Sequence, residues 1–223
     1  MAITFVQSAS ALGVGNVPVA FPLNNTAGNC IVLACAAYTA GGMTLNDSQN
    51  NSYFTVIPFF NNLGNLQGQL FFAFNIKAGP NTVTFAPGAA VGSMASIHEF
   101  SGVDTLDGFA GANGVGNAQD STVAATNHAK ELLFGFTIAS ATNGATITND
   151  PTYTLAESHI DISNTIVSFL TQWKIVSALG NYNSTSTTTV SKGGLVDWGA
   201  EIETFFSSIT PPATKTFVSG FGI

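Results

Sequence analysis

The sequence predicts an all-β protein, a two-sheet antiparallel β-sandwich of the jelly-roll type with little or no helix. Three observations lead to this prediction. Nearly every apolar stretch is short, rich in Val, Ile, Phe, Thr and Tyr, and ends at Gly, Asn or Pro, which is typical of strands. Several stretches alternate apolar and polar residues, as half-buried strands do. No run of about ten residues combines helical spacing with helix caps.

The expected strands follow one another along the whole chain. In the first half they cover residues 3–7, 17–21, 30–38, 53–59, 69–76, 82–85 and 94–100. In the second half they cover residues 108–114, 131–139, 155–160, 165–177, 184–190, 196–206 and 216–221. Half-buried strands in this number imply two antiparallel sheets stacked face to face.

The parity of individual strands predicts which faces are buried. Residues 31–37 are apolar at every position, so we expect a central strand covered on both faces. Cys30 and Cys35 lie five apart on one expected strand and therefore point to opposite faces, so they cannot form a disulfide with each other. We expect two buried thiols. In the strand 131–139 one apolar face consists of Leu132, Phe134, Phe136 and Ile138.

The expected organisation is one sandwich domain over residues 1–208 and a terminal segment over residues 209–223. All-β domains of this length often stay undivided, and no repeat at a fixed period is visible in the sequence. Pro211 and Pro212 disfavour sheet pairing, so the second range is expected to contain a stiff spacer and a short strand-like tail.

The charge balance excludes several classes of partner. Charged residues make up only 8% of the chain, the formal net charge is −7, and the five basic residues are scattered lysines. Nucleic-acid binding needs clustered basic residues, so no nucleic-acid partner is expected. The sequence contains no uninterrupted run of about 18 apolar residues, so no insertion into a membrane is expected. The first residues lack the basic start and apolar run of a signal peptide, and an extracellular or virion-surface location is expected.

Five sequence blocks carry a resemblance to a known group of proteins. They are a Thr-Ala-Gly-Asn block, an Asp-Ser turn followed by Tyr, an Asn-Ile hairpin ending in Asn-Thr-Val-Thr, a Glu-Phe-Ser-Gly-Val block and a Glu-Leu-Leu block, at residues 26–29, 45–53, 72–84, 97–103 and 130–135. In this order they resemble blocks of bacterial and phage jelly-roll proteins that are similar to concanavalin-type lectin sandwiches. The resemblance covers residues 3–206 and implies a sandwich fold. It selects no activity, because lectins, hydrolases, adhesins and coat proteins share such sandwiches.

The best enzymatic lead is a set of acids in the strand 196–206. Asp197, Glu201 and Glu203 alternate and share one face. Jelly-roll glucanases carry acids at alternate strand positions, as retaining hydrolysis requires. Glu201 and Glu203 stand at alternate positions, but no further acid within reach completes the glucanase pattern, and Phe205 follows on the same face. We therefore expect a solvated strand face and no enzymatic activity.

The histidines do not form a metal-binding motif in the sequence. His98, His128 and His159 lie far apart, and none belongs to an H-x-x-x-H or H-E-x-x-H frame. His98 is expected to be a hydrogen-bonded structural residue within a strand. No cofactor is expected from this pattern.

Calcium is the one ion that loop oxygens suggest. Asp47 with Asn46 and Asn50, or Asp104 with Asp107, could supply oxygen ligands to Ca²⁺. The same residue types also stabilise turns by bonding to their own backbone, which explains both clusters without an ion.

Surface features give two further expectations. The aromatic residues are mostly Phe, 18 against four Tyr and two Trp, whereas sugar-binding platforms prefer Trp and Tyr. Glycan acceptor sequons permit N-glycosylation if the chain passes through a glycosylating compartment, and they begin at Asn24, Asn46, Asn50 and Asn183.

The expected function is a non-enzymatic structural or assembly role, as a subunit of an extracellular fibre or of a virion tail, fibre or capsid surface. Its expected partner is another copy of itself. The segment 214–223 alternates so that its apolar side chains suit insertion as a strand into a groove; the assembly residues are Thr216, Phe217, Val218, Phe221 and Ile223. Alternatively, this tail completes an edge of its own sheet. A lectin-like glycan-binding module is the second functional hypothesis and a glycoside hydrolase the third.

Overall fold

The computed structural model describes residues 2–39, 42–56, 59–60, 66–88, 92–140, 146–159, 167–189 and 196–208. In these ranges every regular element is a β-strand and every strand pairing is antiparallel. The predicted all-β class is therefore confirmed. Over the same ranges, no helix has the length and apolar character needed to cross a membrane.

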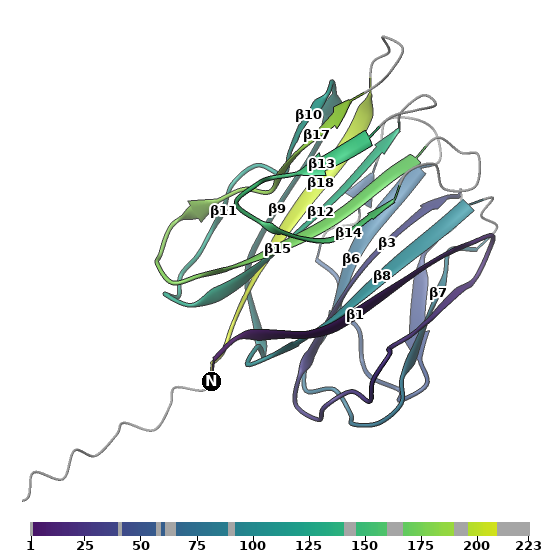
Figure 1. The fold of residues 1–223 in the computed structure, drawn as a ribbon, viewed down its shortest axis with the longest axis vertical. Helices are drawn as coiled ribbons and strands as arrows, with labels where there is room; N and C mark the ends of the chain where they lie inside the picture. The colour runs from purple at the N-terminus through teal and green to yellow at the C-terminus, as the bar shows by residue number, and fades with distance from the viewer. Residues whose placement is uncertain are drawn as a thin grey trace, which may run out of the picture.

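The first half of the chain forms two sheets (Figure 1). A five-stranded sheet has the order β1-β8-β3-β6-β5, and a three-stranded sheet has the order β2-β7-β4. The strands are β1 (Thr4–Gly13), β2 (Val17–Ala20), β3 (Cys30–Tyr38), β4 (Thr44–Asp47), β5 (Phe59–Phe60), β6 (Leu66–Ala73), β7 (Thr82–Ala86) and β8 (Gly92–Ser101).

The second half forms a five-stranded sheet of order β14-β15-β12-β18-β9, a three-stranded sheet of order β10-β17-β13, and the short pair β11-β16. The strands are β9 (Thr105–Val115), β10 (Ala118–Asp120), β11 (Ala124–Ala125), β12 (Glu131–Ser140), β13 (Thr146–Asn149), β14 (Thr154–His159), β15 (Val167–Val176), β16 (Asn181–Tyr182), β17 (Thr185–Thr189) and β18 (Asp197–Phe206).

The two halves repeat one strand order. When β9 is placed on β1, the order β9-β18-β12-β15-β14 matches β1-β8-β3-β6-β5, and β10-β17-β13 matches β2-β7-β4. The registers agree as well: Phe100 pairs with Cys30 in the first half, and Phe205 pairs with Leu132 in the second. Both edge strands also skip one residue at the same place, Val6 in β1 and Asp107 in β9. The repeat that is not visible in the sequence is thus present in the backbone.

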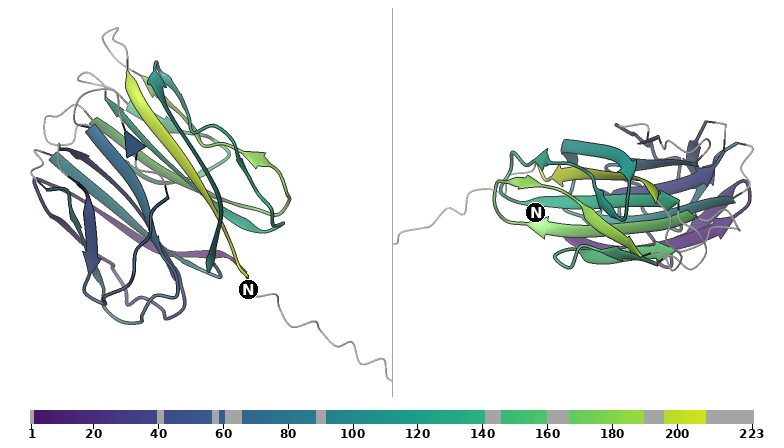
Figure 2. Two further views of the ribbon diagram at one scale, coloured as in Figure 1. Left: turned by 180° about the vertical axis from the view of Figure 1, so that it is seen from behind. Right: turned by 90° about the horizontal axis from the view of Figure 1, so that it is seen from above.

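The sheets stack in four layers, with the five-stranded sheets in the middle (Figure 2). The central core lies between them and draws side chains from both halves, including Val32 and Leu70 from one and Phe134 and Phe205 from the other. Each five-stranded sheet also buries its second face under a three-stranded sheet. Residues 1–208, expected to hold one two-sheet sandwich, therefore hold two sandwiches that share a core.

Most of the predicted strands and faces are present. β3 has its predicted bounds and residues 31–37 are buried on both faces, with Cys30 in the central core and Cys35 in the first-half outer core. Both cysteines are free. The predicted strand 53–59 is reduced to an isolated bridge between Phe54 and Phe72 and to β5, with residues 57–58 outside the described ranges. The short strands β4, β10, β11, β13 and β16 were not predicted from the sequence.

Candidate functional site

A buried carboxylate closes the end of the first sandwich. Glu99 on β8 is fully buried and accepts hydrogen bonds from Gln7 Nε2 at 2.6 Å, Asn25 Nδ2 at 2.7 Å, Thr26 N at 2.9 Å and Asn29 Nδ2 at 2.6 Å. Asn25, Thr26 and Asn29 belong to the loop that leads into β3. Thr26 and Asn29 lie in one of the five blocks of the resemblance and Glu99 in another, so both blocks have a structural role here.

The corresponding place in the second half has a different set of side chains. Counting back from Leu132, which matches Cys30, residues 127–132 (Asn-His-Ala-Lys-Glu-Leu) correspond to residues 25–30 (Asn-Thr-Ala-Gly-Asn-Cys). Glu131 therefore matches Asn29, and His128 matches Thr26. The residue that corresponds to Glu99 is Thr204, so the second half has a hydroxyl at this position of β18 and instead has a carboxylate, Glu131, at the start of β12.

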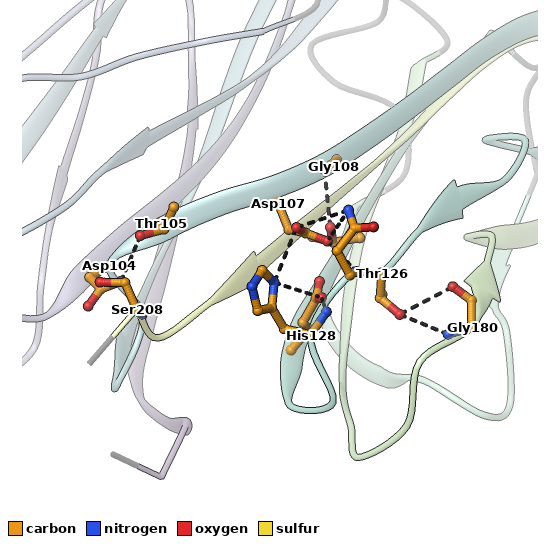
Figure 3. A network of polar contacts seen from close by, with 11 residues as sticks. Asp104, Thr105, Asp107, Gly108, Thr126, His128, Gly180 and Ser208 are labelled. Carbon is orange, nitrogen blue, oxygen red and sulfur yellow. Dashed lines mark hydrogen bonds and ion pairs between the residues drawn. The ribbon is translucent and has the colours of Figure 1, made fainter. Parts of the chain in front are cut away.

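Asp107, His128 and Glu131 converge at this place. Figure 3 shows Asp107 and His128 pointing toward each other. His128 Nδ1 lies 3.3 Å from Asp107 Oδ1 and 3.8 Å from Glu131 Oε1. Asp107 is the residue that β9 skips in its pairing with β18, and a β-bulge of this kind re-aims a side chain. The His128 ring is stacked on Phe206, with ring centroids 3.5 Å apart and an interplanar angle of 7°.

The backbone and a neighbouring amide hold the two carboxylates of this cluster in place. The His128 backbone N–H donates to Glu131 Oε1 at 2.8 Å, and the Asn127 backbone N–H donates to Asp107 Oδ2 at 2.7 Å. The Asn127 side-chain amide also donates to both Asp107 oxygens, at 3.2 and 3.3 Å. Among the described residues, the buried Glu131 Oε2 makes no hydrogen bond of ordinary geometry, although Asp107 and Thr204 lie close enough to affect this carboxyl.

The electrostatics of the two acids differ because their surroundings differ. Burial, together with the Asp107 charge beside it, raises the pKa of the Glu131 carboxyl against the hydrogen bond from His128. Burial also acts to raise the pKa of Asp107, but the hydrogen bonds from Asn127 and the neighbouring His128 lower it overall. Two acids and an imidazole are the side chains here that could hold a metal ion.

Sequence reasoning missed this cluster for a specific reason. It paired Asp107 with Asp104, whereas Asp104 accepts hydrogen bonds from Thr105 Oγ1 and the Ser208 backbone N–H. His128 and Glu131 were not connected because H-x-x-E is too short a motif to stand out. The usable signal was the match between residues 25–30 and 127–132, which becomes visible once the register of the strands is known.

The acids of β18 are buried, and the prediction of a solvated strand face is wrong for two of them. Glu201 and Glu203 are fully buried on the face that carries Phe205 into the central core, while Asp197 is half-buried. No oxygen of either glutamate makes a hydrogen bond of ordinary geometry with the described residues. Alternation was predicted correctly; the error arose because a second five-stranded sheet covers this face.

Burial dominates the proton affinity of these two acids. It raises the pKa of Glu203 to about 8. It also raises the pKa of Glu201 well above the ordinary value, and the neighbouring Glu203 adds to the effect; the backbone N–H of Leu70 acts weakly in the opposite direction. Burial in the core thus favours the neutral, protonated form of both side chains.

His98 is a structural residue, as predicted. It is fully buried on β8, and its Nε2 lies 2.6 Å from Ser96 Oγ. Its ring packs on Phe134 with the centroids 5.0 Å apart. Burial lowers the pKa of His98 to about 3, so the ring stays neutral at physiological pH.

The second-half edge strand is long, uncharged over most of its length and partly apolar on its surface. β9 pairs only with β18 among the described strands and has 11 residues. From Gly108 to Val115 it contains no charged residue and no proline, and Phe109 and Val115 are 48% and 53% exposed. Such an edge offers unpaired backbone groups to another strand.

A groove of about 450 Å³ lies on the outer sheet formed by β10, β13 and β17. Its polar lining includes Gln119, Asp120, Asn149, Asp150 and Thr185, and no aromatic residue lines it. The Asp150 carboxylate accepts from Thr185 Oγ1 at 2.9 Å, and Asp120 accepts from the amide of Asn183. The two acids of the groove are thus already hydrogen-bonded within the protein.

The remaining predicted site residues fall into three groups. Asp47 accepts hydrogen bonds from Asn51, Tyr53 and Asn81, as a turn-stabilising residue does, and binding of calcium to it stays a prediction. The acceptor residues Asn24, Asn46 and Asn50 are exposed, whereas Asn183 is half-buried. The predicted assembly residues lie outside the described residues; they are Thr216, Phe217, Val218, Phe221 and Ile223.

Comparison of the chain with protein-family models, with curated proteins and with solved structures finds no match. The class that the structure defines is an all-β protein built of antiparallel sheets.

Proposed function

We propose that this chain is a non-enzymatic assembly subunit of an extracellular fibre or a virion surface, and that it joins to other copies by adding a strand to the open edge of β9. In the first sandwich the strand orders are β1-β8-β3-β6 and β2-β7-β4. The second sandwich repeats them as β9-β18-β12-β15 and β10-β17-β13. We assign this order to the jelly-roll class, in keeping with the resemblance of the sequence blocks.

The observation that carries the proposal is the character of the β9 edge. Soluble proteins protect exposed edges with lysines, prolines, bulges or short strands, because an unprotected edge pairs with other chains. β9 has its single bulge at Asp107, near its start, and then runs from Gly108 to Val115 without a charge or a proline. Its exposed Phe109 and Val115 would be covered by an added strand. The edge strand β14 of the same sheet instead carries Glu157 and His159.

The segment 214–223 is the strand that we propose to fill this edge, supplied by another copy. Its sequence places Phe217, Phe221 and Ile223 on one face, with glycine and threonine residues on the other. Backbone hydrogen bonds would give affinity, and the alternating apolar side chains would give specificity. A head-to-tail contact of this kind builds a filament unless its rotation closes a ring.

The position of the acids supports a role without catalysis. Glu201 and Glu203, the strongest enzymatic lead in the sequence, lie in the central core, where a glycan cannot reach them. Glu99 is likewise enclosed by four donors from the protein itself. The buried carboxyls are thus enclosed by the protein and are not accessible to a substrate. The exposed edge of β9 is a separate feature, and assembly accounts for it.

A test compares four forms of the full-length chain by light scattering and electron microscopy. The wild type is expected to form oligomers or filaments, and deletion of residues 214–223 should give folded monomers that regain assembly when the same segment is added as a peptide. Asn113→Lys places a charge in mid-edge, opposite Gly199, and should give monomers that the peptide does not rescue. Leu179→Lys adds the same charge at an exposed loop position and should assemble like the wild type.

Three outcomes would overturn the proposal: a wild type that stays monomeric, a truncated chain that assembles normally, or an Asn113→Lys variant that does. If the truncated chain does not fold, as judged by circular dichroism, the Asn113→Lys variant alone decides the question.

A lectin-like module is the second candidate, and the groove beside Asp120 and Asp150 favours it. Carboxylate, amide and hydroxyl groups of the kind found there bind sugar hydroxyls, and the groove is open. Titration with a glycan library would test it: binding that Asp150→Asn abolishes supports this function, and absence of binding removes it.

A further inference from the structure

We propose that Asp107, His128 and Glu131 bind one divalent transition-metal ion of the zinc class. This site is distinct from the β9 edge proposed for assembly and does not depend on it. Its ligands would be one carboxylate oxygen of Asp107, Nδ1 of His128 and one carboxylate oxygen of Glu131.

The distances between the ligand atoms fit such an ion. A zinc ion has Zn–N and Zn–O bonds of about 2.0–2.2 Å, so two ligand atoms of a tetrahedral site lie roughly 3.3–3.6 Å apart. His128 Nδ1 is 3.3 Å from Asp107 Oδ1 and 3.8 Å from Glu131 Oε1. One donor atom from each of the three residues lies within 4.8 Å of the other two. Small side-chain rotations would bring all three to bonding distance of one ion.

The second observation is a buried oxygen without a hydrogen bond of ordinary geometry among the described residues. The Glu131 side chain has no exposed surface, its Oε1 accepts from the His128 backbone N–H, and near its Oε2 the neighbours that act on the carboxyl are Asp107 and Thr204. A buried carboxylate oxygen is costly to leave without a donor. A second carboxylate, that of Asp107, lies beside it, so the pair repels when both are charged. A bound cation would satisfy the oxygen and remove the repulsion.

The first half of the chain shows what the same place looks like when no ion is needed. There, one carboxylate, that of Glu99, receives four hydrogen bonds from neutral donors. In the second half, Glu131 occupies the position that corresponds to Asn29, and Asp107 the position that corresponds to Val6, which gives two carboxylates. His128 occupies the position that corresponds to Thr26, which gives an imidazole. The second place has more negative charge and one buried oxygen unmatched, which is the condition that favours a cation.

The types of ligand select the metal. Calcium prefers an all-oxygen shell of six to eight ligands, whereas imidazole nitrogen suits zinc and its transition-metal neighbours. Hydrogen bonds from Asn127 orient the Asp107 carboxylate, and Phe206 holds the plane of the His128 ring, so the ligands are preorganised. The His128 side chain is 45% exposed, which gives an ion access from solvent and leaves room for a water ligand.

The experiment uses the full chain, stripped with a chelator, and ZnCl₂ as the probe. Isothermal titration calorimetry is expected to give one ion per chain, and the melting temperature should rise with ZnCl₂ and fall back with EDTA. His128→Gln and Asp107→Asn should each reduce zinc affinity at least 10-fold. His159→Gln is the matched control, because His159 lies 3.2 Å from the carboxylate of Glu157 and belongs to no group of three potential metal ligands among the described residues.

Retention of one zinc ion in His159→Gln, together with its loss in the other two variants, supports the site. The proposal is overturned if the wild type binds no zinc, if all three variants bind alike, or if CaCl₂ binds in place of ZnCl₂. Circular dichroism of each variant without metal shows that it folds. If His128→Gln does not fold, Asp107→Asn decides, since an asparagine at position 107 keeps the size of the side chain.

Discussion

Glu131 stands at the start of β12 where Asn29 stands before β3, and this is one of the differences that give the two sandwich ends a different chemistry. In the first half the Asn29 side chain donates to Glu99 at 2.6 Å. In the second half Glu131 is itself an acceptor and faces a second acid, Asp107. The same backbone arrangement thus surrounds a carboxylate with four hydrogen-bond donors at one end, and a pair of acids with fewer donors at the other.

Glu99→Gln is expected to destabilise the protein by about 2–4 kcal/mol. The glutamine removes a charge that accepts four buried hydrogen bonds and turns an NH₂ group toward donors, which leaves buried groups unpaired. Urea unfolding measures the difference. Glu157→Gln is the control, since Glu157 is 29% exposed and its loss should cost less than about 1 kcal/mol. Equal stability of Glu99→Gln and wild type would contradict the role given to Glu99.

The fold class and most long strands were predictable because the central strands carry strong local signals. β3 is continuously apolar and β12 alternates, and both were bounded to within one residue. The short outer strands β4, β10 and β13 were missed because they are polar and of three or four residues, so their pairing is decided by β7 and β17 rather than by their own sequence. The repeat of the two halves was not visible in the sequence because corresponding residues differ in type; His98, for example, corresponds to Glu203, and Ser96 to Glu201.

Phe134→Ala is expected to cost about 3–5 kcal/mol, because the removed ring leaves a cavity in the core shared by both sandwiches. Phe134 is fully buried and contacts the rings of His98 and Phe100. Phe54→Ala is the control, since Phe54 is 55% exposed and should cost much less. A chemical-denaturation midpoint for Phe134→Ala equal to that of the wild type would show that the two central sheets do not pack through this ring.

The candidate metal site was less predictable than the fold because it depends on three separate local events. A bulge turns Asp107 out of the β9 pairing, the loop before β12 brings in His128, and the register of β12 places Glu131 beside both. No sequence spacing encodes the bulge. The β18 acids show the converse: their spacing suggested a site, but their depth in the core could be known only from the packing of the second sheet.

Glu203→Gln is expected to stabilise the protein in a pH-dependent manner. The pKa of Glu203 is about 8 in the folded protein because of burial, against 4.5 in its ordinary state. Below the ordinary value both folded and unfolded chains carry the proton, so the substitution has little effect. As the pH rises from 4.5 toward 8, the unfolded chain releases the proton and the folded chain keeps it, so wild-type stability falls.

The glutamine cannot titrate and therefore avoids this loss. At pH 8 and above, the variant should be more stable than the wild type by roughly 3–5 kcal/mol, since each pKa unit is worth about 1.4 kcal/mol. Urea unfolding at intervals from pH 4 to pH 9 measures the difference. Phe169→Leu is the control for a change in the same core without a titrating group, and its difference from the wild type should stay constant with pH. If the stability difference between Glu203→Gln and the wild type is also constant with pH, Glu203 reaches solvent. The conclusion that Glu201 and Glu203 are enclosed between the two central sheets would then be wrong.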